Sequence, residues 1–260
     1  MIKQIPNIFT LLNLFFGCLA IVACMQSGLV LLNDGNELQA LVIPENIVCA
    51  SVFIGIAAVI DFLDGLVARL LKAPSEMGKQ LDSLADVVSF GVAPAMIIYQ
   101  FLRLSLADKN GSLEVLQILL LPAFIVACAA AYRLARFNID AVQREGFAGV
   151  PVPAIGMFIA GFPLIYWYTN IVSVRVLLHN QWFWYAVIFI SSYLMVSTLP
   201  MLSLKFKNAS VKTLLPFILI AAISVISIFI AGWIAVPVTF LAYVIISLIF
   251  NSAKNKSNVI

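Results

Sequence analysis

The chain has 260 residues, of which 63% are hydrophobic and only 10% carry a charge, and its formal net charge is +3. Soluble proteins carry about 25% charged residues on average, so this composition excludes a soluble globular protein. The basic residues fall in short segments between apolar runs, so the small positive excess gives no reason to expect a nucleic-acid partner. We expect one membrane-embedded all-α domain over residues 1–260, with 205–260 as additional C-terminal helices and tail.

Apolar runs of membrane-spanning length follow one another along the whole chain, since a spanning helix takes about 20 residues. No small-residue cleavage site follows the first run, so we interpret it as a retained helix. The last two runs are separated only by the segment around Gly232, which allows a tight hairpin. The sequence thus predicts about eight transmembrane helices, near residues 7–30, 46–72, 79–102, 114–137, 152–172, 182–202, 212–231 and 233–250.

The basic residues predict the orientation of these helices, because cytoplasmic loops are enriched in Lys and Arg. Twelve of them fall on the side of the amino terminus, namely Lys3, Arg69, Lys72, Lys79, Arg133, Arg136, Arg144, Lys205, Lys207, Lys212, Lys254 and Lys256. Only Arg103, Lys109 and Arg175 fall on the other side. We therefore expect both termini to be cytoplasmic.

Four aspartates, Asp61, Asp64, Asp82 and Asp86, lie in segments that are otherwise apolar enough for a bilayer. An Asp at the centre of a membrane helix costs about 2.5–3.5 kcal/mol on insertion scales, so an uncompensated group of four is unfavourable. Divalent cations are the natural compensation. The alternative is that buried Asp pairs merely hold helices together.

The spacing of the four aspartates indicates that they meet. Asp61 and Asp64 are three residues apart and share a helix face, as do Asp82 and Asp86, which are four apart. Pro74 interrupts the helix between the two pairs, and the connection is short, so the two helices are expected to be antiparallel neighbours. Asp64 and Asp86 then come to similar depth, which predicts a cluster near one membrane surface.

Small and basic residues accompany the aspartates. Gly65 and Ala68 lie beside the first pair, where small side chains let a ligand approach the backbone. Arg69 follows about one turn later and offers a planar fork of donors suited to phosphate. Gly78 lies one turn before Asp82, on the stripe that carries the second pair.

The complete pattern, Asp61-x2-Asp64-Gly65-x2-Ala68-Arg69-x8-Gly78-x3-Asp82-x3-Asp86, resembles the signature of the CDP-alcohol phosphatidyltransferases. The resemblance implies a site for two Mg²⁺ or Mn²⁺ ions, with Asp61, Asp64, Asp82 and Asp86 as ligands and Asp86 also as general base. It implies that Arg69 holds the diphosphate of CDP-diacylglycerol and that Gly65, Ala68, Ser75 and Gly78 line the nucleotide. A Pro-Asn-x-x-Thr motif of the family matches Pro6, Asn7 and Thr10, and the family places it near the nucleotide. Helix capping is the alternative role for Asn7 and Thr10.

A second polar stretch contains Arg133 and Arg136, which are three apart and share a helix face on the side of the aspartates. They either anchor the helix end by the positive-inside rule or bind an anion, the diphosphate or a substrate carboxylate. The run Arg-Leu-Ala-Arg-Phe-Asn, followed by Gly149-x-Pro151-x-Pro153-Ala154, resembles the phosphatidylserine synthase branch of the family. That branch implies phosphatidyl transfer from CDP-diacylglycerol to L-serine, giving phosphatidylserine and CMP.

Two alternatives remain open at this point. Within the family, the acceptor alcohol is glycerol 3-phosphate or inositol phosphate instead of serine. Outside the family, an ion-coupled transporter also places acidic residues within helices, although no internal repeat of the kind common in transporters is visible. Beyond Lys212 at their start, the last two apolar runs contain no Asp, Glu, Lys or Arg, so we expect them to form packing or homodimer surface. We expect an inner-membrane protein of a bacterium, with its active site facing the cytoplasm.

Overall fold

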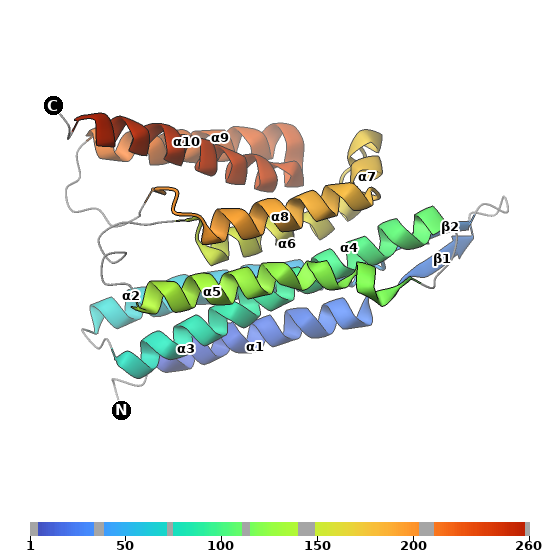
Figure 1. The fold of residues 1–260 in the computed structure, drawn as a ribbon, viewed down its shortest axis with the longest axis horizontal. Helices are drawn as coiled ribbons and strands as arrows, with labels where there is room; N and C mark the ends of the chain where they lie inside the picture. The colour runs from blue at the N-terminus through green and yellow to red at the C-terminus, as the bar shows by residue number, and fades with distance from the viewer. Residues whose placement is uncertain are drawn as a thin grey trace.

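The computed structural model describes residues 5–33, 39–71, 75–110, 115–139, 149–202 and 211–257. Its long helices run side by side along one axis, and α1 begins at the end of the bundle where α10 finishes (Figure 1). The α-helices are α1 (Ile5–Gln26), α2 (Ile47–Leu70), α3 (Glu76–Asp86), α4 (Ala93–Asn110), α5 (Ile125–Ile139), α6 (Val152–Tyr168), α7 (Val172–Leu178), α8 (Gln181–Val196), α9 (Val211–Ala231) and α10 (Ala235–Ser257). Short helical segments are η2 (Val87–Val92), η3 (Gln117–Leu119), η4 (Leu121–Phe124) and η6 (Gly232–Ile234).

The predicted apolar runs are confirmed as helices in the described part of the chain. Five segments there are long and apolar enough to cross a membrane by length and composition: Pro6–Gln26, Ile47–Leu70, Glu76–Lys109, Gln117–Ile139 and Leu214–Phe250. Two further apolar helices, Val152–Tyr168 and Gln181–Val196, are shorter. The fifth segment contains α9 and α10, which fold back on each other (Figure 1) at Gly232, a residue with a φ of 54°. The expected tight hairpin is therefore present.

The end of the first predicted helix is not helical, and a strand hairpin follows it. α1 ends at Gln26, before the predicted limit of residue 30, and β1 (Val30–Asn33) pairs antiparallel with β2 (Gln39–Val42), with Val30 opposite Val42. The hairpin projects at the end of the bundle away from the start of α1 (Figure 1). Val-Leu-Leu suits a strand as well as a helix, and strand pairing supplies the backbone hydrogen bonds that a non-helical segment lacks.

Other helix ends also differ from the predicted ones for identifiable reasons. The run predicted from residue 114 begins as 3₁₀ turns, and regular helix starts only at Ile125, since Pro122 cannot donate a backbone hydrogen bond. The run predicted to residue 202 ends at Val196, where Ser197 leaves the helical conformation with ψ of 158°.

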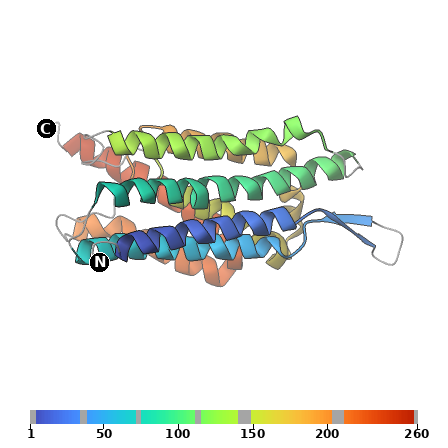
Figure 2. The same cartoon turned by 90° about the horizontal axis from the view of Figure 1, so that it is seen from below.

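Of the five membrane-length segments, the one from Glu76 to Lys109 is the most buried. Figure 2 shows α3, η2 and α4 as one continuous rod with α1 on one side and α5 on the other. Phe101 of α4 stacks on Trp184 of α8, with ring centroids 4.6 Å apart, and both side chains are fully buried. This rod carries Asp82 and Asp86 toward the other helices.

The π-helix η2 follows directly after Asp86 and fits against α1 and α6 by close contacts. A Cβ at Gly17 would lie 2.8 Å from the Ser89 Cα, and a Cβ at Gly156 would lie 2.9 Å from the Phe90 Cβ, so both positions require glycine. π-Helical turns often occur at functional sites because they change the helical register locally. Here the turn brings α3 against α1.

Candidate active site

Three helices bring the aspartates together. α1 packs against both α2 and α3, whereas the backbones of α2 and α3 approach each other less closely. α3 begins with Ser75 as its N-cap, whose hydroxyl accepts a hydrogen bond from the Gly78 backbone N–H at 2.9 Å. The residues predicted to interrupt the helix, 72–74, lie outside the described residues; α2 ends at Leu70 and α3 begins at Glu76. α1 is a third wall that the spacing did not predict.

The acidic group consists of three aspartates in close contact and a fourth nearby. Asp61, Asp64 and Asp82 each offer a carboxylate oxygen, and these oxygens lie within 4.8 Å of one another. Asp86 is outside this group but lies within electrostatic range of Asp61 and Asp82. Asp64 and Asp86 are only 7% and 6% exposed, and the other two are half-buried. The four residues are thus brought together, with Asp86 set deepest along α3.

α1 supplies hydrogen bonds to two of these carboxylates. The Thr10 hydroxyl donates to Asp64 Oδ2 at 2.9 Å, and Asn13 Nδ2 donates to Asp86 Oδ1 at 3.2 Å. Both polar side chains are buried. The structure therefore gives Thr10 a contact with a carboxylate, at a position inside α1 where capping does not apply.

Asn13 was missed by the sequence reasoning. A pattern for it exists, since Asn7, Thr10 and Asn13 recur every three residues on an otherwise apolar helix and so share a face. Its fully buried side chain has its amide oxygen without a hydrogen-bond partner. Burying such a group is costly, which marks the position as part of a polar site.

The residues expected to contact the nucleotide lie around one edge of this site. Asn7 is buried, and a Cβ at Gly78 would lie 3.0 Å from Asn7 Oδ1 and 2.9 Å from the Ser75 hydroxyl, so these three residues are in contact. A Cβ at Gly65 would meet nothing within 4 Å, so there is open space above that residue. A side chain at position 78 would displace the ends of the Asn7 and Ser75 side chains, whereas glycine at 65 leaves space open.

Arg69 is exposed at the end of α2, and its Nε donates to the Gly65 carbonyl at 2.8 Å. This bond fixes the stem of the side chain on its own helix. The guanidinium retains four further N–H groups for an anion. Ala68 precedes Arg69 and is half-buried.

The two arginines of α5 have different surroundings. Arg133 is 9% exposed, its Nε is buried without a hydrogen-bond partner, and it lies within electrostatic range of Asp86 and Tyr243. Arg136 instead donates from Nη1 to the Val196 carbonyl at 3.2 Å, at the C-terminal end of α8. The structure brings Arg133 to the acidic site and uses Arg136 to attach α5 to α8.

A short polar network holds α5 against α3. Lys79 Nζ donates to the Asn138 carbonyl at 3.1 Å, and Asn138 Nδ2 donates to the Ser83 hydroxyl at 2.8 Å. Asn138 closes the Arg-Leu-Ala-Arg-Phe-Asn run, which gives that part of the motif a structural role. The network fixes the helix that carries Arg133 at the level of the aspartates.

The Gly-x-Pro-x-Pro motif attaches the start of α6 to the end of α8. Gly149 has a φ of 75°, and its N–H donates to the Leu199 carbonyl at 2.8 Å. A Cβ there would lie 2.8 Å from the Ser197 carbonyl oxygen, so only glycine fits. Pro151 is the N-cap of α6, where the missing N–H costs nothing.

The donor set fits a divalent cation. Three carboxylates meet within a few ångströms, and within the described ranges no Lys or Arg forms an ion pair with any of the four aspartates. The neutral donors Thr10 and Asn13 do not offset this charge. Mg²⁺ and similar hard cations prefer carboxylate oxygens, so Asp61, Asp64 and Asp82 are the residues that would hold such an ion.

A family model described as CDP-alcohol phosphatidyltransferase matches residues 3–178, about two thirds of the sequence. The matched region includes the four aspartates, α1 and both arginines of α5. The chain belongs to this family.

Curated relatives share one printed name, CDP-diacylglycerol–serine O-phosphatidyltransferase. The chain is similar to the protein of that name from Bacillus subtilis (38% identical, over 43% of this chain and 58% of the relative). It is also similar to those from Mycobacterium leprae (31%, over 75% and 62%) and Saccharomyces cerevisiae (37%, over 61% and 52%). The chain thus spans roughly half to three fifths of the length of these relatives.

Proposed function

We propose that this protein transfers the phosphatidyl group from CDP-diacylglycerol to L-serine, giving phosphatidylserine and CMP. The observation that carries the proposal is the group of Asp61, Asp64 and Asp82 with Asp86 and the buried Arg133 beside it. Membership of the family supports the CDP-linked donor, and the names of the relatives support serine as acceptor.

Two Mg²⁺ or Mn²⁺ ions are proposed as cofactors, held by Asp61, Asp64 and Asp82, with Asp86 completing the ligand set. When bound, such ions neutralise charge on a diphosphate and on the oxygens that attack and leave. Thr10 orients the Asp64 carboxylate through its 2.9 Å hydrogen bond. The ligands are thereby fixed from two sides, by their own helices and by α1.

The cytidine end of the donor is proposed to bind between the starts of α1 and α3 and the end of α2. Arg69 contacts the diphosphate, since its guanidinium is exposed and matched to phosphate oxygens. The space above Gly65 admits the ligand to the backbone of α2, next to Ala68. Asn7, Ser75 and Gly78 form the facing wall.

Asp86 is proposed as the general base. Its carboxylate takes the proton of the serine hydroxyl, and the resulting oxygen forms a bond to the phosphorus that bears the diacylglycerol. The bond from that phosphorus to the bridging oxygen breaks, and CMP leaves with the electron pair. Asn13 holds Asp86 in place through its 3.2 Å hydrogen bond.

Arg133 is proposed to bind the serine carboxylate. Four aspartates repel an acceptor that carries a carboxylate, unless a cation lies beside them. Arg133 meets this requirement best, because it is buried and near Asp86. Arg136 is proposed as a weaker contributor, since one of its nitrogens already binds the end of α8.

We further propose eight transmembrane helices with both termini and the active site on the cytoplasmic side of a bacterial inner membrane. Among residues with described side chains, Arg69 is at the end of α2, Lys79 is at the start of α3, and Arg133 and Arg136 are near the end of α5. These helix ends lie with the aspartates, which supports this orientation. A homodimer through α9 and α10 remains a prediction; their outward apolar face, including Phe229 and Ile230, is available for it. Cysteine cross-linking across this face tests the dimer.

The central experiment is an incubation of purified full-length protein with CDP-diacylglycerol, Mn²⁺ or Mg²⁺, and a panel of labelled serine, glycerol 3-phosphate and inositol phosphate. We expect phosphatidylserine and CMP in equal amounts. EDTA should stop the reaction, and added divalent metal should restore it. A labelled lipid formed only with another alcohol would contradict serine as the acceptor, and no metal-dependent release of CMP with any alcohol would favour the transporter.

A further inference from the structure

A second polar site lies at the end of the bundle opposite the aspartates. It is a cavity of about 680 Å³ between the end of α4, α7 and the start of α8. This volume is within the range of small-molecule pockets, about 300–1,000 Å³. Its lining includes Lys109, Arg175, His179, Asp108, Gln181 and Trp182. The family signature does not use any of these residues.

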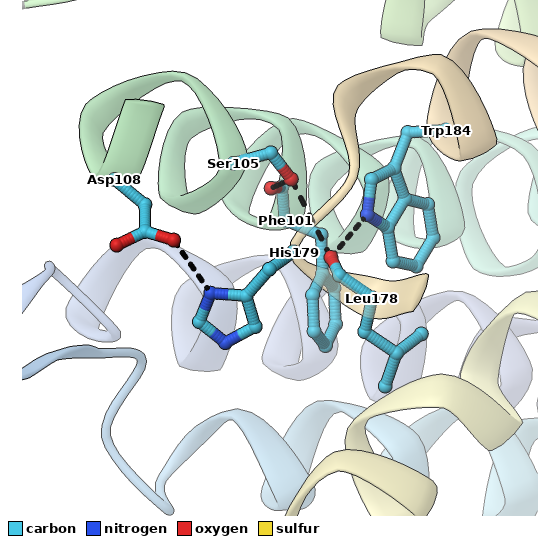
Figure 3. A network of polar contacts seen from close by, with 6 residues as sticks. All are labelled: Phe101, Ser105, Asp108, Leu178, His179 and Trp184. Carbon is cyan, nitrogen blue, oxygen red and sulfur yellow. Dashed lines mark hydrogen bonds and ion pairs between the residues drawn. The ribbon is translucent and has the colours of Figure 1, made fainter. Parts of the chain in front are cut away.

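The charge of this cavity is unbalanced toward positive. Lys109 and Arg175 face one carboxylate, Asp108, whose Oδ2 lies 3.2 Å from His179 Nδ1 (Figure 3), so two cations oppose a single anion. Within the described part of the chain, neither Lys109 nor Arg175 forms an ion pair. Two cations opposed by one carboxylate leave a positive excess in one concave site, which is suited to an anion. Arg175 Nε also donates to the Thr169 carbonyl at 3.3 Å, and its other N–H groups remain for a ligand.

The wall that carries Arg175 and His179 is rigidly held. The Leu178 carbonyl accepts hydrogen bonds from Trp184 Nε1 at 2.8 Å and from the Ser105 hydroxyl at 3.4 Å (Figure 3). Leu178 itself is buried, and Trp184 stacks on Phe101. α7 is therefore fixed between α4 and α8, which holds the backbone of Arg175 and His179 beside the end of α4.

The rim of the cavity is apolar and aromatic. Trp182 is 70% exposed and Val176 is 66% exposed, and the Trp182 ring lies 5.9 Å from that of Tyr185. Exposed Trp and Tyr are typical of the headgroup level of membranes. Gln181 adds a buried amide oxygen without a partner, which can accept from a hydroxyl or amine beside a phosphate.

We infer that this cavity binds the phosphate headgroup of an anionic phospholipid from the leaflet opposite the aspartate site. Lys109 and Arg175 contact the phosphate, and the glycerol and acyl chains follow the surface of Val176 and Trp182. Free inorganic phosphate shares the charge chemistry but makes no use of the apolar rim. This inference does not rest on the proposed transfer reaction.

The test is native mass spectrometry of the full-length protein in detergent, titrated with phosphatidylglycerol, phosphatidylcholine or inorganic phosphate. Wild type should retain phosphatidylglycerol more tightly than phosphatidylcholine. The double variant Lys109→Gln/Arg175→Gln should lose at least about tenfold in affinity for phosphatidylglycerol, the size expected for charge-assisted bonds. The charge-preserving variant Lys109→Arg/Arg175→Lys should retain most of the wild-type affinity for phosphatidylglycerol.

Arg103→Gln is the matched control, because Arg103 is on the same helix but does not line the cavity. It should change the affinity by less than about twofold. Equal affinity of wild type and the double variant would overturn the inference, as would phosphate binding that depends on Lys109 and Arg175 without any preference for phosphatidylglycerol. If the double variant does not fold, the two single variants answer the same question, each with a loss of several-fold.

Discussion

The two ends of this bundle carry opposite kinds of polar site. At one end, four acidic side chains sit inside membrane-length helices, and α1 donates hydrogen bonds to two of them. At the other end, cationic side chains surround a single carboxylate near the helix termini. The charged groups of the first site lie within the helices, and those of the second site lie near the helix ends.

The difference teaches where charge is tolerated in such a bundle. Acidic residues set within apolar helices are expensive unless something compensates them, and the proposed cations would supply that compensation. Basic residues at helix ends cost little, because long side chains reach the headgroup region. The acidic end is therefore expected to respond strongly to substitution, and the basic end weakly.

The largest effect is expected from removing a metal ligand. Asp82→Ala or Asp61→Ala should abolish transfer, because each deletes one of three carboxylates that lie within 4.8 Å of one another. The loss of transfer is measured as release of CMP from CDP-diacylglycerol. Mn²⁺ binding, monitored by electron paramagnetic resonance, gives an independent readout. Near-normal turnover in a folded variant would show that the group is not the metal site.

Asp86→Asn should lower turnover by about 10²–10⁴-fold, which is the usual contribution of a general base. The amide preserves the size of the side chain but cannot take the serine proton. Turnover at saturating substrates and the affinity for CDP-diacylglycerol should be measured separately. A loss confined to lipid affinity would leave Asp86 without the role of base.

Arg133→Ala should raise the Michaelis constant for serine by at least about tenfold, from a charge-assisted bond of roughly 1.5–3 kcal/mol. Arg136→Ala is the comparison; it should have a smaller effect, since Arg136 contacts the end of α8. If both variants raise the Michaelis constant for CDP-diacylglycerol and leave that for serine unchanged, the arginines bind the diphosphate.

Thr10→Val should raise the dissociation constant for Mn²⁺ by only about 2- to 10-fold, the size of one net hydrogen bond. The effect is limited because the Thr10 hydroxyl also lies 3.2 Å from the Pro6 carbonyl, so its bond to Asp64 is shared. Thr10→Ser retains the hydroxyl and should bind Mn²⁺ like wild type. An equal loss in both variants would assign the effect to packing.

The smallest effect is expected at the other end of the molecule. Arg103→Gln should change turnover and both Michaelis constants by less than about twofold, since Arg103 is only half-buried and lies away from the acidic site. A large loss of transfer would mean that the two ends are coupled, and the comparison between them would fail.

The sequence by itself determined the membrane class, the succession of apolar helices and the four aspartates. Each depends on local properties: length of an apolar run, spacing along a helix, or a carboxylate in an apolar context. The same local reasoning failed at residues 27–30, because α1 ends at Gln26 and Val30 already belongs to a strand that pairs with 39–42. The short segment alone does not specify which other segment of the chain it pairs with.

Only the tertiary structure decided which side chains complete the acidic site. Asn13 reaches Asp86 because the π-helix η2 and the glycine contacts bring α3 against α1. The spacing did not distinguish Arg133 from Arg136. In the structure Arg133 is buried near Asp86, whereas Arg136 donates a hydrogen bond to the end of α8. These outcomes depend on contacts between residues distant in sequence, which helical periodicity specifies only as a face and never as a partner.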